Sequence, residues 1–157
     1  MKEVLISVNK EHLDNILDCI KTIEWRKKPL PLGKNYGYET KNKGGCGKVT
    51  GEFYIVENIK FNLLGDTYKP QWLAKGCVPY DFLVKYANGK EYLYANIIEN
   101  AKRYDKPKEL SEFKRWNRTE ENSPCTNTKW LYPDCKECKE CNLTRPPQSW
   151  CYVEVER

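Results

Sequence analysis

The spacing of hydrophobic residues predicts a small domain built from strands and helices. Glu3–Val8 has the pattern of a strand, with Val4, Ile6 and Val8 on one face and Leu5 on the other. In the next segment hydrophobic side chains recur at the spacing of one helical face, with Asn9 as the N-cap and the helix end expected near residues 19–21. The residues on this face are Leu13, Ile16, Leu17 and Ile20.

The rest of the chain alternates between strand and loop patterns. We expect strands at residues 22–26, 35–40, 48–61, 91–100 and 150–154, a glycine-rich turn at 41–47 and a short helix at 79–86. Gly51 inside its strand indicates a bulge or a close backbone approach. Residues 62–78 resemble a loop, 105–113 an extended segment, and 115–142 a polar, cysteine-rich insertion. These elements predict an α+β fold: a small, mixed, partly open β-barrel with two short helices and a cysteine-rich inserted loop.

Length and composition agree with one globular domain over residues 1–157. The chain is 39% hydrophobic and 31% charged, which excludes a disordered or membrane-embedded class. No hydrophobic run is long enough to span a membrane, and the first residues lack the apolar stretch of a secretory signal. We therefore expect a cytoplasmic protein.

The positive charge is concentrated in one part of the chain. The net charge is +5, and residues 21–48 alone carry eight Lys and Arg against two Glu, or +6. A basic segment of this kind suits an anionic partner such as nucleic acid. A solvated basic loop without a partner is the alternative, and charge alone does not separate the two.

Four segments, in this order, resemble the ASCH domain family of the PUA-like superfamily. They are Ile-Ser-Val at 6–8 with its helix running into Lys-Thr-Ile-Glu-Trp-Arg at 21–26, Tyr-Glu-Thr-Lys at 38–41, Gly-Lys-Val-Thr-Gly-Glu-Phe at 47–53, and Arg-Pro-Pro-Gln-Ser-Trp at 145–150. Residues 104–113 and the cysteine-rich stretch are similar to a phage- and prophage-associated bacterial subgroup. The resemblance implies a partly open barrel whose cleft binds nucleic acid, in particular RNA, or a modified nucleotide.

The candidate cleft residues lie where the first helix meets the next strand. Strand alternation places Thr22, Glu24 and Arg26 on one face, beside Lys21. The two cations suit a phosphate, and the carboxylate of Glu24 suits a base amine. The further candidates for ligand contact are Tyr38, which could stack on a base, and Lys41, Lys48 and Ser149. An ordinary surface ion pair is the alternative interpretation of Glu24.

Two other function classes stay open. Relatives that deacylate acetylated cytidine resemble the chain at Lys21, but Glu24 stands where they have a threonine, and Asp81 is the one acid near their downstream carboxylate. An amidohydrolase or ribonuclease that uses Lys21, with Glu24, is therefore the enzyme alternative, and we favour a binding protein. A phage accessory module that contacts another protein is the third. His12, the only histidine, is expected on the exposed side of the first helix, which argues against a Ser-His-Asp site.

The cysteines of the insertion have the spacing of a metal site. Two residues separate Cys135 from Cys138, and two more separate Cys138 from Cys141. Cys125 precedes them in the same insertion. Four thiolates bind zinc tetrahedrally, and metal binding would order a segment that has no hydrophobic core. We expect a structural zinc ion on these four, with free thiols, disulfides or an iron–sulfur cluster as alternatives. Rival fourth ligands are Cys46, Cys77 and Cys151, and Cys19 is expected to be buried in the first helix.

Overall fold

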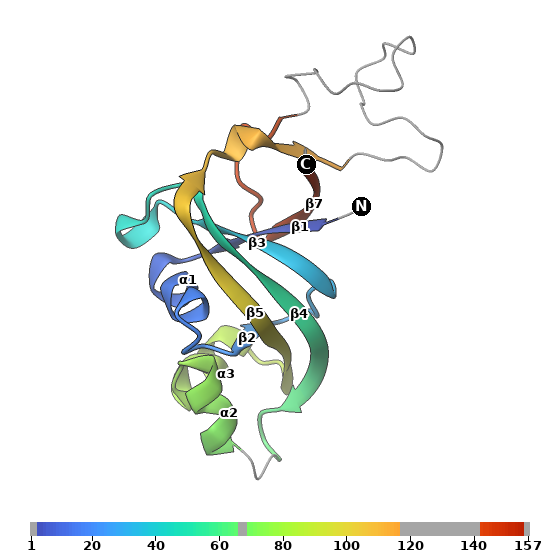
Figure 1. The fold of residues 1–157 in the computed structure, drawn as a ribbon. Coiled ribbons are helices and arrows are strands. Elements are labelled where there is room, and N and C mark those ends of the chain that lie inside the picture. The colour runs from blue at the N-terminus through green and yellow to red at the C-terminus, as the bar shows by residue number, and fades with distance from the viewer. Residues whose placement is uncertain (1–2, 66–68, 117–141, 156–157) are drawn as a thin grey trace.

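Within the described residues of the computed structural model (3–65, 69–116 and 142–155), seven strands form one mixed sheet. The strands are β1 (Glu3–Val8), β2 (Ile23–Arg26), β3 (Gly33–Glu39), β4 (Val49–Asn62), β5 (Tyr92–Lys108), β6 (Phe113–Arg115) and β7 (Trp150–Val155). Their order is β2-β5-β4-β3-β1-β7-β6. β1 runs parallel to β3, and the other neighbours are antiparallel. The sheet curves without closing, which confirms the predicted partly open α+β fold (Figure 1).

The two longest strands, β4 and β5, form an antiparallel pair that curves along its length (Figure 1). Its register shifts at three places, one of them between Val49 and Gly51. Bulges of this kind bend a strand and increase its twist. A Cβ at Gly51 would lie 2.5 Å from the Leu17 side chain and from the Lys102 carbonyl oxygen. Gly51 therefore makes the close backbone approach that the sequence predicts, and it lies next to the irregularity in the strand pairing.

Three α-helices, rather than the two predicted, lie in the described part of the chain: α1 (Lys10–Leu17), α2 (Lys69–Gly76) and α3 (Tyr80–Ala87). α3 is the helix expected at 79–86. The prediction of a loop throughout 62–78 is wrong, because α2 fills its second half. Trp72 and Leu73 of α2 pack against a hydrophobic cluster that includes Trp25, Phe61 and Leu83. This packing stabilises a helix whose own hydrophobic pattern is weak.

The first helix ends a turn earlier than predicted. Cys19 adopts a left-handed backbone conformation with φ of 59°, and the Asn15 carbonyl oxygen accepts from the N–H groups of both Ile20 and Lys21. Ile20 is therefore 61% exposed and Cys19 is exposed, so the predicted burial of these two residues is wrong. The sharp turn places Lys21 two residues before β2, where the candidate cleft begins. No described helix is long and apolar enough to cross a membrane.

Candidate ligand-binding cavity

A cavity of about 300 Å³ lies between α1, β2 and α3. The end of β1 contributes Ser7 and Val8, and β2 contributes Glu24, Trp25 and Arg26. The other lining residues are Asn9, His12, Lys21, Thr40, Asn42, Val78, Phe82, Leu83, Tyr86 and Gln148. Its volume is at the lower end of the range for small-molecule sites, roughly 300–1,000 Å³. The cavity is therefore of a size for a small ligand.

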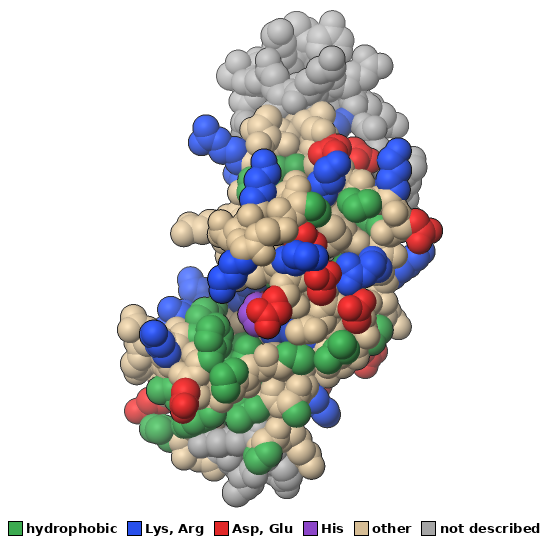
Figure 2. Space-filling model, turned by 90° about the vertical axis from the view of Figure 1, so that its left-hand side faces the viewer, with side chains coloured by type: hydrophobic (Ala, Val, Ile, Leu, Met, Phe, Trp, Pro, Cys, Tyr) green, Lys and Arg blue, Asp and Glu red, His purple; other side chains and the backbone are tan. Residues whose placement is uncertain are grey.

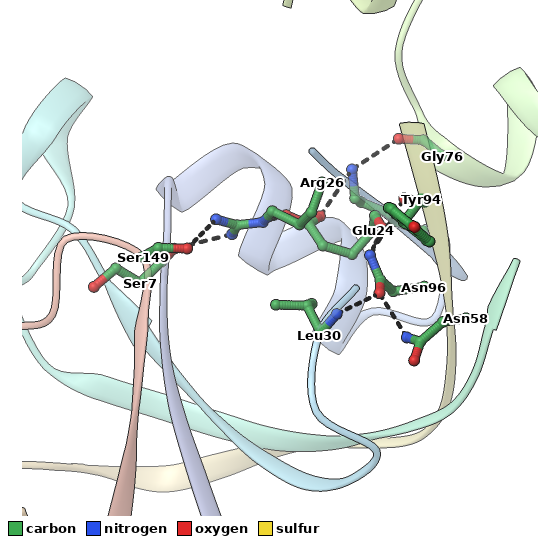
Figure 3. Close-up of polar contacts among 10 residues, drawn as sticks. Ser7, Glu24, Arg26, Leu30, Asn58, Gly76, Tyr94, Asn96 and Ser149 are labelled. Carbon is green, nitrogen blue, oxygen red and sulfur yellow. Dashed lines mark hydrogen bonds and ion pairs between the residues drawn. The ribbon is translucent and has the colours of Figure 1, made fainter. Parts of the chain in front are cut away.

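A buried cluster of three charged side chains, the Lys21–Glu24–Arg26 cluster, forms one wall of this cavity. Lys21 Nζ lies 3.2 Å from Glu24 Oε2, and Arg26 Nε lies 3.0 Å from Glu24 Oε1. Lys21 also donates to the Gly76 carbonyl oxygen at 2.8 Å, at the end of α2 (Figure 3). Lys21 and Glu24 are only 2% and 6% exposed. A carboxylate thus stands between two cations, and each of its oxygens is already in an ion pair.

The electrostatics of the cluster keep Glu24 ionised. Burial acts to raise the pKa of the Glu24 carboxyl, but the charges of Lys21 and Arg26 outweigh it and hold the pKa below its ordinary value. At neutral pH the cluster therefore carries one net positive charge. A wall with this charge attracts an anion and does not supply a carboxylic acid for proton donation.

Arg26 connects the cluster to the rim of the cavity. One of its terminal nitrogens donates to Ser149 Oγ at 3.3 Å and the other to the Ser7 carbonyl oxygen at 3.2 Å (Figure 3). Ser7 Oγ in turn donates to the Pro147 carbonyl oxygen at 2.7 Å. Arg26 therefore joins β2 to β1 and to the segment that leads into β7.

A buried asparagine fixes β2 and the following loop beneath the cluster. Asn96 is fully buried, and its Nδ2 donates to the Glu24 carbonyl oxygen at 2.8 Å. Its Oδ1 accepts from the Leu30 N–H at 2.8 Å and from Asn58 Nδ2 at 2.7 Å (Figure 3). These bonds hold the backbone of Glu24 and the loop after Arg26 in place, so the charged groups have a rigid support.

Aromatic side chains of α3 line the opposite part of the cavity. The Phe82 and Tyr86 rings are parallel within 5°, with centroids 6.4 Å apart, and Phe82 is 49% exposed. Lys27 Nζ lies 5.2 Å from the centre of the Tyr86 ring. In Figure 2, hydrophobic side chains gather over the part of this face where α2 and α3 lie. The cavity thus combines a cationic wall with flat, accessible ring faces.

The structure brings together only some of the predicted site residues. Lys21, Glu24 and Arg26 line the cavity, and Ser149 contacts Arg26 at its rim. Four others lie elsewhere. Thr22 forms backbone hydrogen bonds with Lys75 and Ile98, and Tyr38 is a core residue that is 4% exposed. Lys41 is exposed and does not line the cavity, and Lys48 forms an ion pair with Glu109.

His12 is the cavity residue that the sequence misplaces. It is half-buried and lines the cavity, so its predicted position on the exposed side of the first helix is wrong. His12 precedes Ile16 by four residues and therefore lies on the same stripe of the helix as a core residue. This spacing in the sequence indicates that His12 faces the interior. No sequence pattern places Phe82 and Tyr86 at the cavity, because they reach it only through the packing of α3.

The other candidate chemistry is not assembled at this cavity. Asp81, the candidate downstream carboxylate, is exposed and is not among the lining residues. Cys125, Cys135, Cys138 and Cys141 lie outside the described residues, so the zinc site stays a prediction, which metal analysis of protein purified under reducing conditions without chelator tests. Elsewhere in the described part, Cys46, Cys77 and Cys151 are free thiols and no group of three or more His, Cys, Asp or Glu is placed to hold a metal.

No protein-family model and no curated protein matches the chain. Solved structures of an ASCH protein from Zymomonas mobilis share its fold: the structure titled simply ASCH is 20% identical, with a TM-score of 0.63 over 99% of this chain and 87% of that one. A tyrosine-to-phenylalanine variant of that protein gives 19% identity and the same TM-score over 100% and 91% of the two chains. A serine-to-alanine variant gives 19% identity and a TM-score of 0.63 over 99% and 88%.

Proposed function

The chain has the ASCH-domain fold, and we propose that it binds single-stranded nucleic acid, RNA in the first place, with one nucleotide in the cavity beside the Lys21–Glu24–Arg26 cluster. The observation that carries this proposal is the pairing of a buried cationic wall with accessible aromatic rings in one small cavity. Single-strand binders combine these two elements, a cation for the phosphate and a ring for the base. An unstacked nucleotide offers both partners at once.

The two cations retain hydrogen-bonding capacity for a phosphate. A guanidinium has five N–H donors, and Arg26 directs one each to Glu24, Ser7 and Ser149. An ammonium has three, and Lys21 uses two of them on Glu24 and Gly76. Because Glu24 fixes both side chains, their remaining donors are held in place before a ligand arrives. Such preorganisation reduces the entropy that binding costs.

The α3 rings provide a surface for the base. Phe82 and Tyr86 line the cavity, and Lys27 Nζ lies over the Tyr86 ring, where it adds positive charge. Stacking of a base on an aromatic ring contributes about 1–3 kcal/mol and tolerates any base. We therefore expect binding with little base preference at this position and a strong dependence on salt.

Fluorescence anisotropy with labelled single-stranded oligonucleotides tests the proposal. Arg26→Ala removes a charged hydrogen-bond donor and should weaken binding roughly ten- to a hundredfold. The matched control is Arg103→Ala, which removes the same charge from a residue that does not line the cavity and should change affinity little. Thermal unfolding confirms that both variants fold. Absence of binding to any oligonucleotide at low salt, or equal effects of the two substitutions, would contradict the proposal.

The hydrolase alternative has weaker support from the geometry. A lysine nucleophile must direct a free electron pair at the substrate, whereas Lys21 Nζ is already held by Glu24 Oε2 at 3.2 Å and by the Gly76 carbonyl oxygen at 2.8 Å. Turnover of acylated nucleosides or RNA by the wild type, lost in Lys21→Ala, would revive this hypothesis, and an inert wild type would remove it. The phage-associated setting and a protein-contacting role for the cysteine-rich insertion stay predictions.

A further inference from the structure

His12 lies in a wall that two hollows share. The larger is the cavity described above, and the second, of about 230 Å³, is lined by Asn9, Lys10, Glu11, His12, Asp14 and Lys43. Asn9 and His12 belong to both. Figure 2 shows the imidazole, in purple, partly visible between the hydrophobic patch and the neighbouring charged side chains. A strand with one nucleotide in the cavity therefore has room for its neighbour across His12.

The imidazole is not held by hydrogen bonds of the fold. Its Nδ1 is buried and has no hydrogen-bond partner among the described residues. An unpaired buried group of this kind costs about 1–3 kcal/mol, so native structures rarely keep one without a use. No hydrogen bond among the described residues involves Nε2 either, and Nε2 is not one of the buried unpaired atoms. Nε2 is therefore the ring nitrogen that a ligand in the cavity can reach.

His12 also supplies what the charged cluster lacks. Lys21 and Arg26 can only donate, and both carboxylate oxygens of Glu24 are engaged in ion pairs. Burial and the Lys21 charge lower the pKa of His12; Glu24 and Glu11 act to raise it, and Lys43 to lower it. The ring is therefore neutral at pH 7, with one nitrogen that donates and one that accepts.

We propose, on the basis of the proposed function, that His12 hydrogen-bonds the ribose 2′-hydroxyl of the bound nucleotide and thereby makes the cavity prefer RNA over DNA. The 2′-hydroxyl both donates and accepts, and it is the group by which proteins distinguish the two nucleic acids. A neutral imidazole matches it, whereas the cations recognise a phosphate that RNA and DNA share. The cluster then holds the strand, and His12 selects the sugar.

The test compares short fluorescein-labelled oligouridine, oligodeoxyuridine and 2′-O-methyl oligouridine of equal length. We expect the wild type to bind oligouridine roughly two- to tenfold more tightly than the other two. His12→Phe keeps a planar ring and removes the hydrogen bonds, so its affinity for oligouridine should fall to that for oligodeoxyuridine, which stays unchanged. Asp18→Asn is the control from the end of the same helix: Asp18 lines neither hollow, so this variant should keep the preference.

The outcomes separate this inference from the function it rests on. Equal wild-type affinities for oligouridine and oligodeoxyuridine, or a preference that persists in His12→Phe, overturn the role of His12 and leave nucleic-acid binding in place. Failure of the wild type to bind any of the three overturns both. If His12→Phe does not fold, His12→Gln together with the 2′-O-methyl probe decides the matter, because a glutamine amide restores a donor and an acceptor and should keep part of the preference.

Discussion

Two clusters of charged side chains adjoin α1, and they differ chiefly in burial. In one, Glu24 lies between Lys21 and Arg26, with side chains that are 3–18% exposed. In the other, which we call the Arg103 cluster, Arg103 reaches Asp14 and Asp18, each at 3.0 Å, with side chains that are 30–53% exposed. The contact distances are alike. The clusters differ in burial and also in charge, because Glu24 has two cations around it whereas Arg103 lies between two carboxylates.

The difference in burial shows which cluster costs desolvation free energy when the protein folds. Exposed ion pairs form with little desolvation and contribute little. Buried ions lose their hydration, and a well-packed hydrophobic replacement is often as stable. A contribution to stability therefore gives little reason for the Lys21–Glu24–Arg26 cluster to be present. Its place in the wall of a cavity, with N–H donors to spare, supplies an explanation that the Arg103 cluster does not need.

The largest expected effect follows from breaking the buried cluster. Lys21→Met leaves Glu24 buried with one cation instead of two, and loss of one partner from a buried pair typically costs about 3–5 kcal/mol. Urea unfolding monitored by circular dichroism measures the loss. The double variant Lys21→Met/Glu24→Gln removes both charges of the pair and should recover part of it. A loss no larger than that of an exposed pair would refute the distinction between the clusters.

The candidate cluster could be predicted from sequence because it is local. Lys21, Glu24 and Arg26 lie within six consecutive residues, so helix exit and strand alternation are enough to bring them together. The strand pattern succeeded for the same reason: Ile6 and Val8 of β1, and Phe53 and Ile55 of β4, are buried at a two-residue spacing. Elements with a strong internal period can be found without knowledge of their neighbours.

What could not be predicted depends on contacts between distant residues. α2 has little hydrophobic pattern of its own and is stabilised by packing beside Trp25 and Phe61. The early end of α1 depends on the left-handed residue Cys19, which its side-chain type does not favour. Phe82 belongs to the site only because α3 folds back over β2. The sequence thus predicts the charged half of the cavity but not the aromatic half.

A smaller effect is expected from the exposed cluster. Arg103→Met removes both contacts to Asp14 and Asp18, and we expect a loss of at most about 1 kcal/mol in the free energy of unfolding. Because solvent-exposed charges are screened, the loss should shrink further when the ionic strength is raised to about 1 M. Urea unfolding of wild type and variant at low and high salt measures both. A loss that matches Lys21→Met, or that salt leaves unchanged, would show that exposure is not the deciding variable.

The smallest expected effect extends the comparison to pH, through the histidine beside the buried cluster. Burial and the Lys21 charge lower the pKa of His12 in the folded protein below the unfolded value of 6.5, so the unfolded chain binds the proton first as pH falls. Stability is therefore full above pH 6.5 and declines as pH drops toward the folded pKa. His12→Gln cannot take up this proton, so the melting temperature of the wild type should fall more than that of the variant between pH 7 and pH 5. A parallel decline in the two proteins would mean that the protonation of His12 is insensitive to the buried cluster.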